Sequence, residues 1–320
     1  MIDSPATSSE SRKVDVVGVG LNATDTVISL PAYPERGAKL EYTDLSILPG
    51  GQVATTMIAC QTWGLATRYV GKLGDDDAAR LHCDAFQRAG VDARLITVAG
   101  GISPQSLILV DALGERTVLC RRDEQMTLRP EELQREWVVN ARLLHVDGHD
   151  TAAATQAVHW AREAGIDTVA DLDDVYPAVE DMIANIDYLI VNRDFPHRLT
   201  GERDLESALR KIQQRYGSRL TAATLGRDGV LAWDGRRIVH RPAYDVPVAD
   251  TTGAGDIFRA GFIYGLLQGW PLEQQLDFSC AAAGMNCTEQ GARGGISPVK
   301  QIKDLMATGA RCASEYHLLS

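Results

Sequence analysis

Short apolar segments alternate with amphipathic segments through the middle of the chain. The apolar segments, which we expect to form strands, are residues 143–147, 168–172, 188–192 and 220–225. The amphipathic segments, which we expect to form helices, are residues 151–164, 178–184 and 205–216. Short strands separated by helices of about 10–14 residues require crossover connections, so the pattern predicts an α/β fold with a mostly parallel sheet covered on both faces. Residues 14–300 contain no repeat or linker, which indicates one continuous core.

Two regions interrupt this rhythm. Residues 25–49 contain three prolines among alternating polar and apolar positions, which excludes a crossover helix. Residues 95–121 are expected to form a hairpin, with arms at 106–111 and 116–121 and a turn at 112–115. Two small β pieces inserted into a parallel core predict a lid, residues 25–49 and 95–122, over a site at the carboxyl edge of the main sheet.

Composition and charge narrow the function classes. The 320 residues include 43 acidic and 32 basic side chains, a net charge of −11, which argues against binding to nucleic acid or to an anionic membrane surface. No apolar run approaches the ~18 residues of a membrane span, and residues 1–13 read as a disordered polar tail without an apolar signal segment. The six cysteines form no C-x-x-C pair, so buried thiols in a reducing cytoplasm are favoured over zinc or disulfide sites.

One short motif points in a misleading direction. Residues 18–23 match the G-x-G-x-x-[GA] dinucleotide fingerprint after a predicted strand at residues 14–19. That fingerprint requires a helix to begin at the glycines, whereas β-branched residues and then Pro31 and Pro34 follow here. A nicotinamide-dependent dehydrogenase is therefore disfavoured, and the alternative is that the strand end presents Asn22 and Asp25 to a polar ligand.

A longer motif is far more specific. The string D-T-T-G-A-G-D-I-F-R-A-G-F at residues 250–262 places Gly253, Ala254 and Gly255 directly before an apolar helical face. Small residues allow a phosphate to approach the backbone, and the free N–H groups of the first helical turn point at it. A carboxylate at Asp256 would repel that anion unless it accepts a proton from an attacking hydroxyl. The competing interpretation is a capped helix with glycines used for close packing.

With this string, the sequence resembles the ribokinase-like carbohydrate kinases, also called the PfkB family. The string fits the family's C-terminal signature at every restricted position. Further matching segments extend over nearly the whole chain: Gly50-Gly51 before a helix, Gly64, Gly71–Asp76, Ser106 with its hairpin, Asn192 with Leu199–Gly201, Thr224–Gly229, and Gly291-Ala292. The resemblance implies a three-layer α/β/α ribokinase-like domain, residues 14–320, with a small β-sheet lid.

The resemblance also implies residue roles. Asp256 matches the catalytic base, and Gly253, Ala254 and Gly255 match the backbone anion hole. Residues expected to bind the sugar are Asp25, Asn22, Gly50, Gly51, Thr55 and Ser106. Residues expected to bind ATP are Asn192, Thr224, Gly226, Gly229, Gly253 and Gly255. Asp250 and Thr252 lie where some relatives hold a monovalent cation.

Two departures affect these expectations. Thr55 stands where the G-G-x-x-x-N pattern has an asparagine that commonly contacts sugar, so the hydroxyl pattern that is bound here is expected to differ. Phe195 stands where the N-x-x-E pattern has an acid near magnesium, and the neighbouring Asp194 is a candidate substitute.

Other polar residues have plainer expectations. His145 and His149 are expected to be ordinary loop or strand-end histidines, with one of them facing the site as the alternative. Arg121-Arg122 is expected to be a solvated strand end, with contact to an anionic sugar group as the alternative. Arg259, three residues after Asp256, is expected either to orient that aspartate or to face solvent.

The expected function is a cytoplasmic, ATP-dependent sugar kinase that uses Mg²⁺, and K⁺ if the cation position is occupied. The alternatives are a nucleoside kinase or a phosphosugar kinase of the same fold, or a non-catalytic sugar-binding regulator. The hairpin edge also predicts a homodimer formed through the lid.

Overall fold

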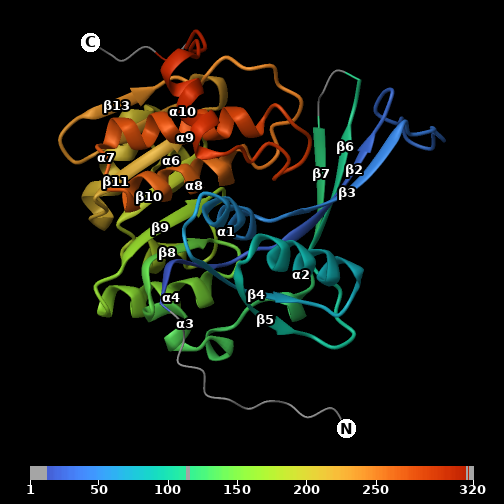
Figure 1. The fold of residues 1–320 in the computed structure, drawn as a ribbon, viewed down its shortest axis with the longest axis horizontal. Coiled ribbons are helices and arrows are strands. Elements are labelled where there is room, and N and C mark those ends of the chain that lie inside the picture. The colour runs from blue at the N-terminus through green and yellow to red at the C-terminus, as the bar shows by residue number, and fades with distance from the viewer. Residues whose placement is uncertain (1–12, 113–115, 315, 317–320) are drawn as a thin grey trace.

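A nine-stranded sheet forms the centre of the molecule in the computed structural model, which describes residues 13–112, 116–314 and 316 (Figure 1). The strand order is β13-β12-β11-β10-β9-β8-β1-β4-β5. The strands from β11 to β5 in this order run parallel, and β12 and β13 join antiparallel at one edge. Their bounds are β1 (Val14–Val19), β4 (Thr67–Leu73), β5 (Asp92–Thr97), β8 (Ala141–Asp147), β9 (Asp167–Leu172), β10 (Tyr188–Asn192), β11 (Leu220–Thr224), β12 (Val230–Trp233) and β13 (Ile238–Arg241).

Helices cover both faces of this sheet. One face carries α1 (Gln52–Thr62), α2 (Asp77–Ala89), α8 (Ala254–Leu267), α9 (Leu272–Asn286) and α10 (Val299–Thr308). The other carries α3 (Arg135–Val139), α4 (Thr151–Glu163), α5 (Val179–Ile183), α6 (Phe195–Thr200) and α7 (Leu205–Tyr216). Successive residues of a strand point to opposite faces, so Val16 of β1 packs into the first core and Val17 into the second. This confirms the predicted three-layer α/β/α fold.

The local signals in the sequence explain where the elements end. Asp204 accepts a hydrogen bond from the Ser207 N–H at the start of α7, and Gly217 ends this helix with φ of 80°. Helix α1 begins directly after Gly51, as the double glycine predicts. After β1 the chain enters another strand rather than a helix, which confirms that residues 18–23 are not a dinucleotide-binding turn.

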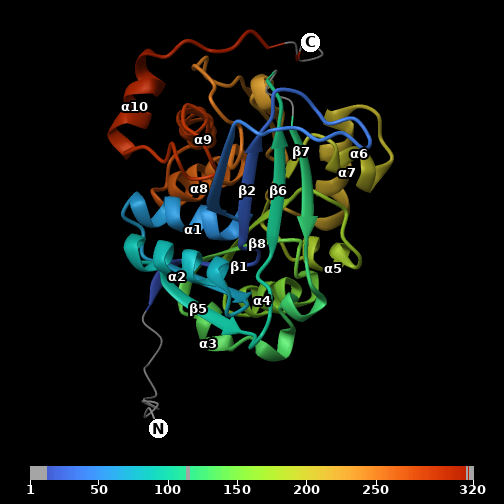
Figure 2. The ribbon, with the colours of Figure 1, turned by 90° about the vertical axis from the view of Figure 1, so that its right-hand side faces the viewer.

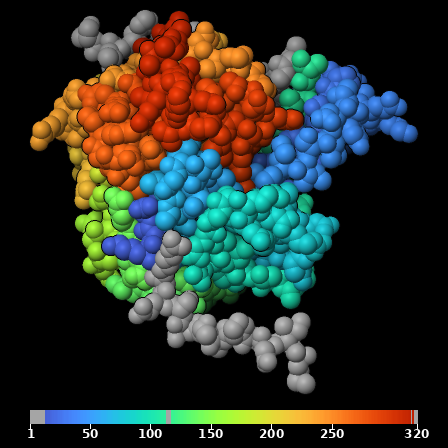
Figure 3. Space-filling model, in the orientation of Figure 1, coloured from blue at the N-terminus to red at the C-terminus, as the bar shows by residue number. Residues whose placement is uncertain are grey.

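A second, four-stranded sheet stands away from the body in Figure 1 and faces the viewer in Figure 2; it is here called the lid sheet. Its order is β3-β2-β6-β7, with β2 (Ala23–Ser29), β3 (Asp44–Gly50), β6 (Gln105–Val110) and β7 (Arg116–Arg121). The two predicted β pieces are joined by parallel pairing of β2 with β6. In the space-filling view the lid sheet projects from one side of the molecule (Figure 3).

The predicted start of the hairpin was wrong. Residues 95–97 belong to β5, which pairs with β4 in the central sheet, and the hairpin begins at Gln105. Alternation over a few residues cannot distinguish the two sheets, since either partner buries one face. Residues 1–12 of the predicted 1–13 tail and residues 113–115 of the predicted turn lie outside the described residues. Over the described ranges, no helix has the length and apolar character needed to cross a bilayer.

Candidate active site

Asp256 lies in the first turn of α8, at the end of a tight glycine turn. Gly253 precedes the helix with φ of 73°, and a side chain there would place Cβ 2.4 Å from the Ala292 carbonyl oxygen. The Asp256 carbonyl accepts a hydrogen bond from Thr56 Oγ1 at 3.1 Å, which ties the turn to α1. The loop around Ala292 therefore presses against the turn that presents the Asp256 carboxylate and the first N–H groups of α8.

A buried ion pair lies behind this turn. Arg259 and Asp171 form a salt bridge of 2.8 Å, with side chains only 4% and 2% exposed. Arg259 also donates to the Ile190 carbonyl at 3.2 Å, and its Nη1 lies 2.6 Å from where a Gly255 Cβ would be. Arg259 therefore does not face solvent. It holds a positive charge under the predicted anion hole, which suits a site that stabilises phosphate oxygens.

These charges act on Asp256. Burial and then the negative charge of Asp171 raise the pKa of Asp256 well above its usual range, while Arg259 opposes the shift. Burial also raises the pKa of Asp171 to about 7, against the attraction of Arg259. A carboxylate with a raised pKa is a stronger base than an ordinary aspartate, which suits it to accept a proton from an alcohol.

The lid sheet brings the predicted sugar-side residues to Asp256. Asp25 and Ser106 are paired neighbours on β2 and β6, so their side chains share one face of the lid sheet. The Asp25 carboxylate packs against Gly50, where a Cβ would lie 2.3 Å from its Oδ2. Gly51 has φ of 88° and touches the backbone of Asn22. Asp25 is near enough to Asp256 for its charge to raise the Asp256 pKa.

Two of the predicted sugar-binding residues are turned into the protein. Asn22 is 2% exposed, and its amide donates to Tyr69 Oη at 2.6 Å and to the Lys72 carbonyl. Thr55 is 0% exposed, and its hydroxyl accepts a hydrogen bond from Arg293 Nε at 3.1 Å. The structure thus places both side chains in the protein interior, where each makes a hydrogen bond to a neighbouring side chain.

Arg293 was not predicted from the sequence. Its Nη2 donates to the Gly50 carbonyl at 2.6 Å, and burial lowers the pKa of this guanidinium to about 10 despite the nearby charges of Asp256 and Asp25. The available signal was its position directly after the Gly291-Ala292 pair, but a single arginine in a loop does not reveal which way it points.

A cavity of about 1040 Å³ lies beside the glycine turn. Among the residues that line it are Thr224, Gly226, Gly229, Ala254 and Gly255. Gly229 has φ of 85°, and a Cβ there would meet the Arg241 carbonyl at 1.9 Å. The structure therefore brings together the predicted nucleotide-side loop and the predicted anion hole around one space, large enough for a nucleotide.

Asn192 is held by the backbone around it. Its Nδ2 donates to the Asp173 carbonyl at 2.6 Å, and its Oδ1 accepts from the Phe195 N–H at 2.9 Å. Phe195 is 0% exposed and belongs to the core beside α6, which explains why this position carries no acid. Asp194 is exposed at the start of α6.

Asp250 links the two loops that flank the glycine turn. One carboxylate oxygen accepts from the Thr252 N–H and the other from the Gly291 N–H, both at 2.8 Å. The Thr252 carbonyl accepts from Asn286 Nδ2 at 3.2 Å. These contacts make Asp250 a structural support for the glycine turn.

The remaining polar residues have structural partners. His145 is buried, with Nδ1 3.2 Å from the Val169 carbonyl oxygen, and His149 lies 3.2 Å from Tyr176 Oη. Arg122 is not simply solvated: it forms an ion pair with Asp150 and donates to the His149 carbonyl at 2.7 Å. Arg121 is exposed.

Comparisons with known proteins agree with this geometry. Residues 21–299 match the model of the pfkB family of carbohydrate kinases. A 5-dehydro-2-deoxygluconokinase from Clostridium perfringens is 24% identical and covers 93% of this chain and 94% of its own length. The ribokinase of Staphylococcus aureus is also 24% identical, and the match covers 91% of this chain and 99% of that ribokinase.

Solved structures show the same fold. The ribokinase of Thermotoga maritima superposes with a TM-score of 0.80 at 21% identity, covering 92% of this chain and 100% of that one. Arabidopsis thaliana ribokinase, solved with ribose and ATP, gives a TM-score of 0.80 at 22% identity, covering 92% and 99%. Since the family model spans most of the chain, this protein belongs to the pfkB family of carbohydrate kinases and is a phosphotransferase.

Proposed function

We propose that this protein transfers the γ-phosphoryl group of Mg–ATP to a primary hydroxyl of a small sugar, with Asp256 as the general base. The observation that carries the proposal is the position of Asp256 between two sites. Its neighbours Ala254 and Gly255 line the large cavity, and its carboxylate interacts with the charge of Asp25 on the lid side. The phosphoryl donor, ATP, in the cavity and the phosphoryl acceptor, a sugar, under the lid sheet would thus meet at this carboxylate.

The chain's own groups have distinct tasks in this reaction. Asp25 accepts hydrogen bonds from sugar hydroxyls and orients the acceptor. Asp256 takes the proton of the attacking hydroxyl as the new O–P bond forms. The first N–H groups of α8, with Arg259 behind them, stabilise the negative charge that develops on the transferred group. Mg–ATP supplies the phosphoryl group and its bound cation.

The nucleotide site fits this assignment because small residues surround the cavity where phosphates would lie. We assign Thr224, Gly226 and Gly229 to the nucleotide side and Gly253 and Gly255 to the phosphates. A ribokinase II candidate from Escherichia coli, solved with ATP and Mg²⁺, has the same fold with a TM-score of 0.82 at 17% identity. A K⁺ ion at Asp250 and Thr252 is a further proposal, tested by comparing activity in K⁺ and Na⁺ buffers.

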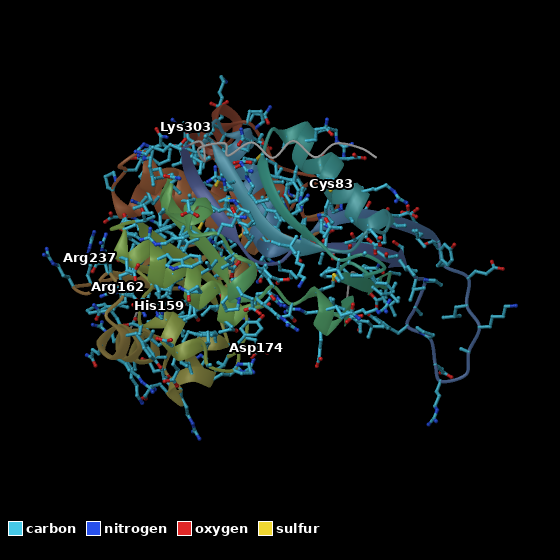
Figure 4. All side chains as sticks on the ribbon, turned by 90° about the horizontal axis from the view of Figure 1, so that it is seen from below. Cys83, His159, Arg162, Asp174, Arg237 and Lys303 are labelled. Carbon is cyan, nitrogen blue, oxygen red and sulfur yellow. The ribbon has the colours of Figure 1, made fainter. Side chains whose placement is uncertain are left out.

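Assembly and compartment are also proposals. The outer face of the lid sheet exposes Leu45, Ile47 and Leu119, which are 42%, 57% and 53% exposed. Apolar side chains on the face of a small projecting sheet favour a homodimer formed through the lid. All six cysteines are free, among them the exposed Cys83 of α2 (Figure 4), which suits a reducing cytoplasm.

The test is a panel of hexoses, pentoses, ketoses, sugar acids, nucleosides and sugar phosphates, assayed for ADP release with Mg–ATP. Phosphorylation of a free sugar or sugar acid supports the proposal. Turnover confined to nucleosides or to sugar phosphates would instead support the corresponding alternative. Sugar binding without ADP release by any member of the panel would indicate a non-catalytic regulator.

A further inference from the structure

Arg293 is held rigidly along one edge of its guanidinium. Nε donates to Thr55 Oγ1 at 3.1 Å, and Nη2 donates to the Gly50 carbonyl at 2.6 Å. Thr55 lies in the first turn of α1, and Gly50 ends β3 two residues before that helix begins. With two donors fixed by two acceptors, the plane of the guanidinium and the direction of its other edge are determined.

The other edge has no protein partner. Nη1 is buried and makes no hydrogen bond within the described part of the chain. An unpartnered buried donor on a charged group is costly, and a ligand that accepts its hydrogen bonds would remove that cost. The free edge carries the two N–H groups of Nη1 and the remaining N–H of Nη2, which together match the two oxygens of a carboxylate.

The free edge of the Arg293 guanidinium lies at the proposed acceptor site. Arg293 interacts with the charges of both Asp25 and Asp256, the two carboxylates assigned to the sugar. The same loop touches the lid sheet, because Gly291 packs against Leu48 of β3, and touches the glycine turn through Ala292. Arg293 is therefore fixed between the residues that orient the acceptor and the residue that deprotonates it.

We propose that Arg293 is a specificity-determining residue whose free edge binds the carboxylate of the acceptor, so that the preferred substrate is a sugar acid. A guanidinium can only donate hydrogen bonds, so its partner must accept, and a carboxylate accepts in a fork without a proton to place. The acceptor's hydroxyl groups satisfy Asp25 and Asp256 separately. Thr55, where the resemblance predicts an asparagine, serves as the anchor for the arginine. The inference rests on the proposed kinase function of this site.

The test compares matched pairs of acceptors that differ only at one end, such as D-gluconate against D-glucitol and D-galactonate against D-galactitol. Wild type is expected to favour the acids. Arg293→Gln should raise the KM for acids about tenfold to a hundredfold, as loss of a charge-assisted fork predicts, and change the KM for neutral partners much less. Arg293→Lys, which keeps the charge and loses the fork, should rescue only part of the preference.

Two further variants separate recognition from folding and from general electrostatics. Thr55→Val removes the anchor of Nε without touching the guanidinium, and should weaken discrimination between acids and neutral partners while leaving the fold intact. Arg142→Gln changes a half-exposed arginine that pairs with Asp15, and should leave the preference unchanged. Calorimetric binding of the same acceptors to wild type and Arg293→Gln gives a readout that needs no turnover.

The outcomes are distinguishable. If neutral sugars are phosphorylated and acids neither bind nor react, the inference is wrong and the kinase function stands. If Arg293→Gln weakens acids and neutral partners equally and moves the acid limb of the rate profile to higher pH, Arg293 only balances Asp25 and Asp256, and the inference is again wrong. If no acceptor is phosphorylated, the kinase proposal fails, and acid binding lost in Arg293→Gln would still support the inference.

Discussion

The buried pair of Arg259 and Asp171 predicts a large and pH-dependent loss of stability when one partner is removed. Arg259→Met keeps much of the side-chain volume but leaves the Asp171 carboxylate in the core, with both side chains of the pair almost fully buried in the wild type. Breaking a buried pair in this way costs about 3–5 kcal/mol of unfolding free energy. The Ile190 carbonyl loses a donor as well.

The pH dependence follows from the raised pKa of Asp171, which is about 7 with Arg259 present. When a carboxyl group has a higher pKa in the folded state than in the unfolded state, its contribution to the unfolding free energy is fully present below the unfolded-state pKa. That contribution is lost as the pH rises through the folded-state pKa. Removing Arg259 raises that folded pKa further. The difference in unfolding free energy between wild type and the less stable Arg259→Met variant should therefore grow between about pH 6 and pH 9.

The interaction energy of this pair is measured by urea denaturation of four proteins: wild type, the two single variants and the double variant Asp171→Asn/Arg259→Met. The double variant should recover most of the loss, because no unpaired charge remains. Arg259→Met within about 1 kcal/mol of wild type at every pH would refute the reasoning, as would strictly additive effects of the two substitutions. The exposed pair of Lys300 and Asp304 provides the control, since Lys300→Met should cost well under about 1 kcal/mol.

Three other predictions follow from single contacts. Gly229→Ala should raise the KM for ATP about tenfold, because the new Cβ would displace the loop from Arg241. The control is Gly235→Ala, which is also at positive φ but faces only the end of the Gln213 side chain, and it should leave that KM unchanged. Asp147→Ala should lower the unfolding free energy by about 2–4 kcal/mol in urea titrations, because the N–H groups of Leu21 and His149 lose their acceptor. A loss under about 1 kcal/mol would contradict this prediction. Ile47→Glu should convert a dimer to monomers in light scattering at unchanged melting temperature, and a monomeric wild type would exclude the lid dimer.

The sequence predicted the central sheet and the glycine turn well because both are local. The helix at residues 205–216 has its cap, apolar face and terminal glycine within one segment, and the structure places α7 at the same bounds. The 250–262 string likewise contains the glycine turn, the first N–H groups of α8 and Asp256 in nearly consecutive residues. Their functional roles remain predictions.

Features that depend on distant partners were harder to predict. Arg259 could face solvent or the protein on helical spacing alone, and its burial is set by Asp171 at the end of β9. Arg293 follows a glycine-alanine pair in a loop, and only the positions of Gly50 and Thr55 fix its direction. Residues 95–97 have the alternation of a hairpin arm, yet the available edge of β4 binds them.

The most direct measurement of the central claim is the single-turnover rate of Asp256→Asn with an accepted sugar and Mg–ATP, alongside calorimetric affinities for each. The amide keeps the size of the side chain but cannot accept the proton. Phosphoryl transfer should fall by about 10²–10⁴ or more, while both affinities stay within a few-fold of wild type. Turnover that remains within a few-fold of wild type, with intact binding, would contradict the assignment of Asp256 as the base.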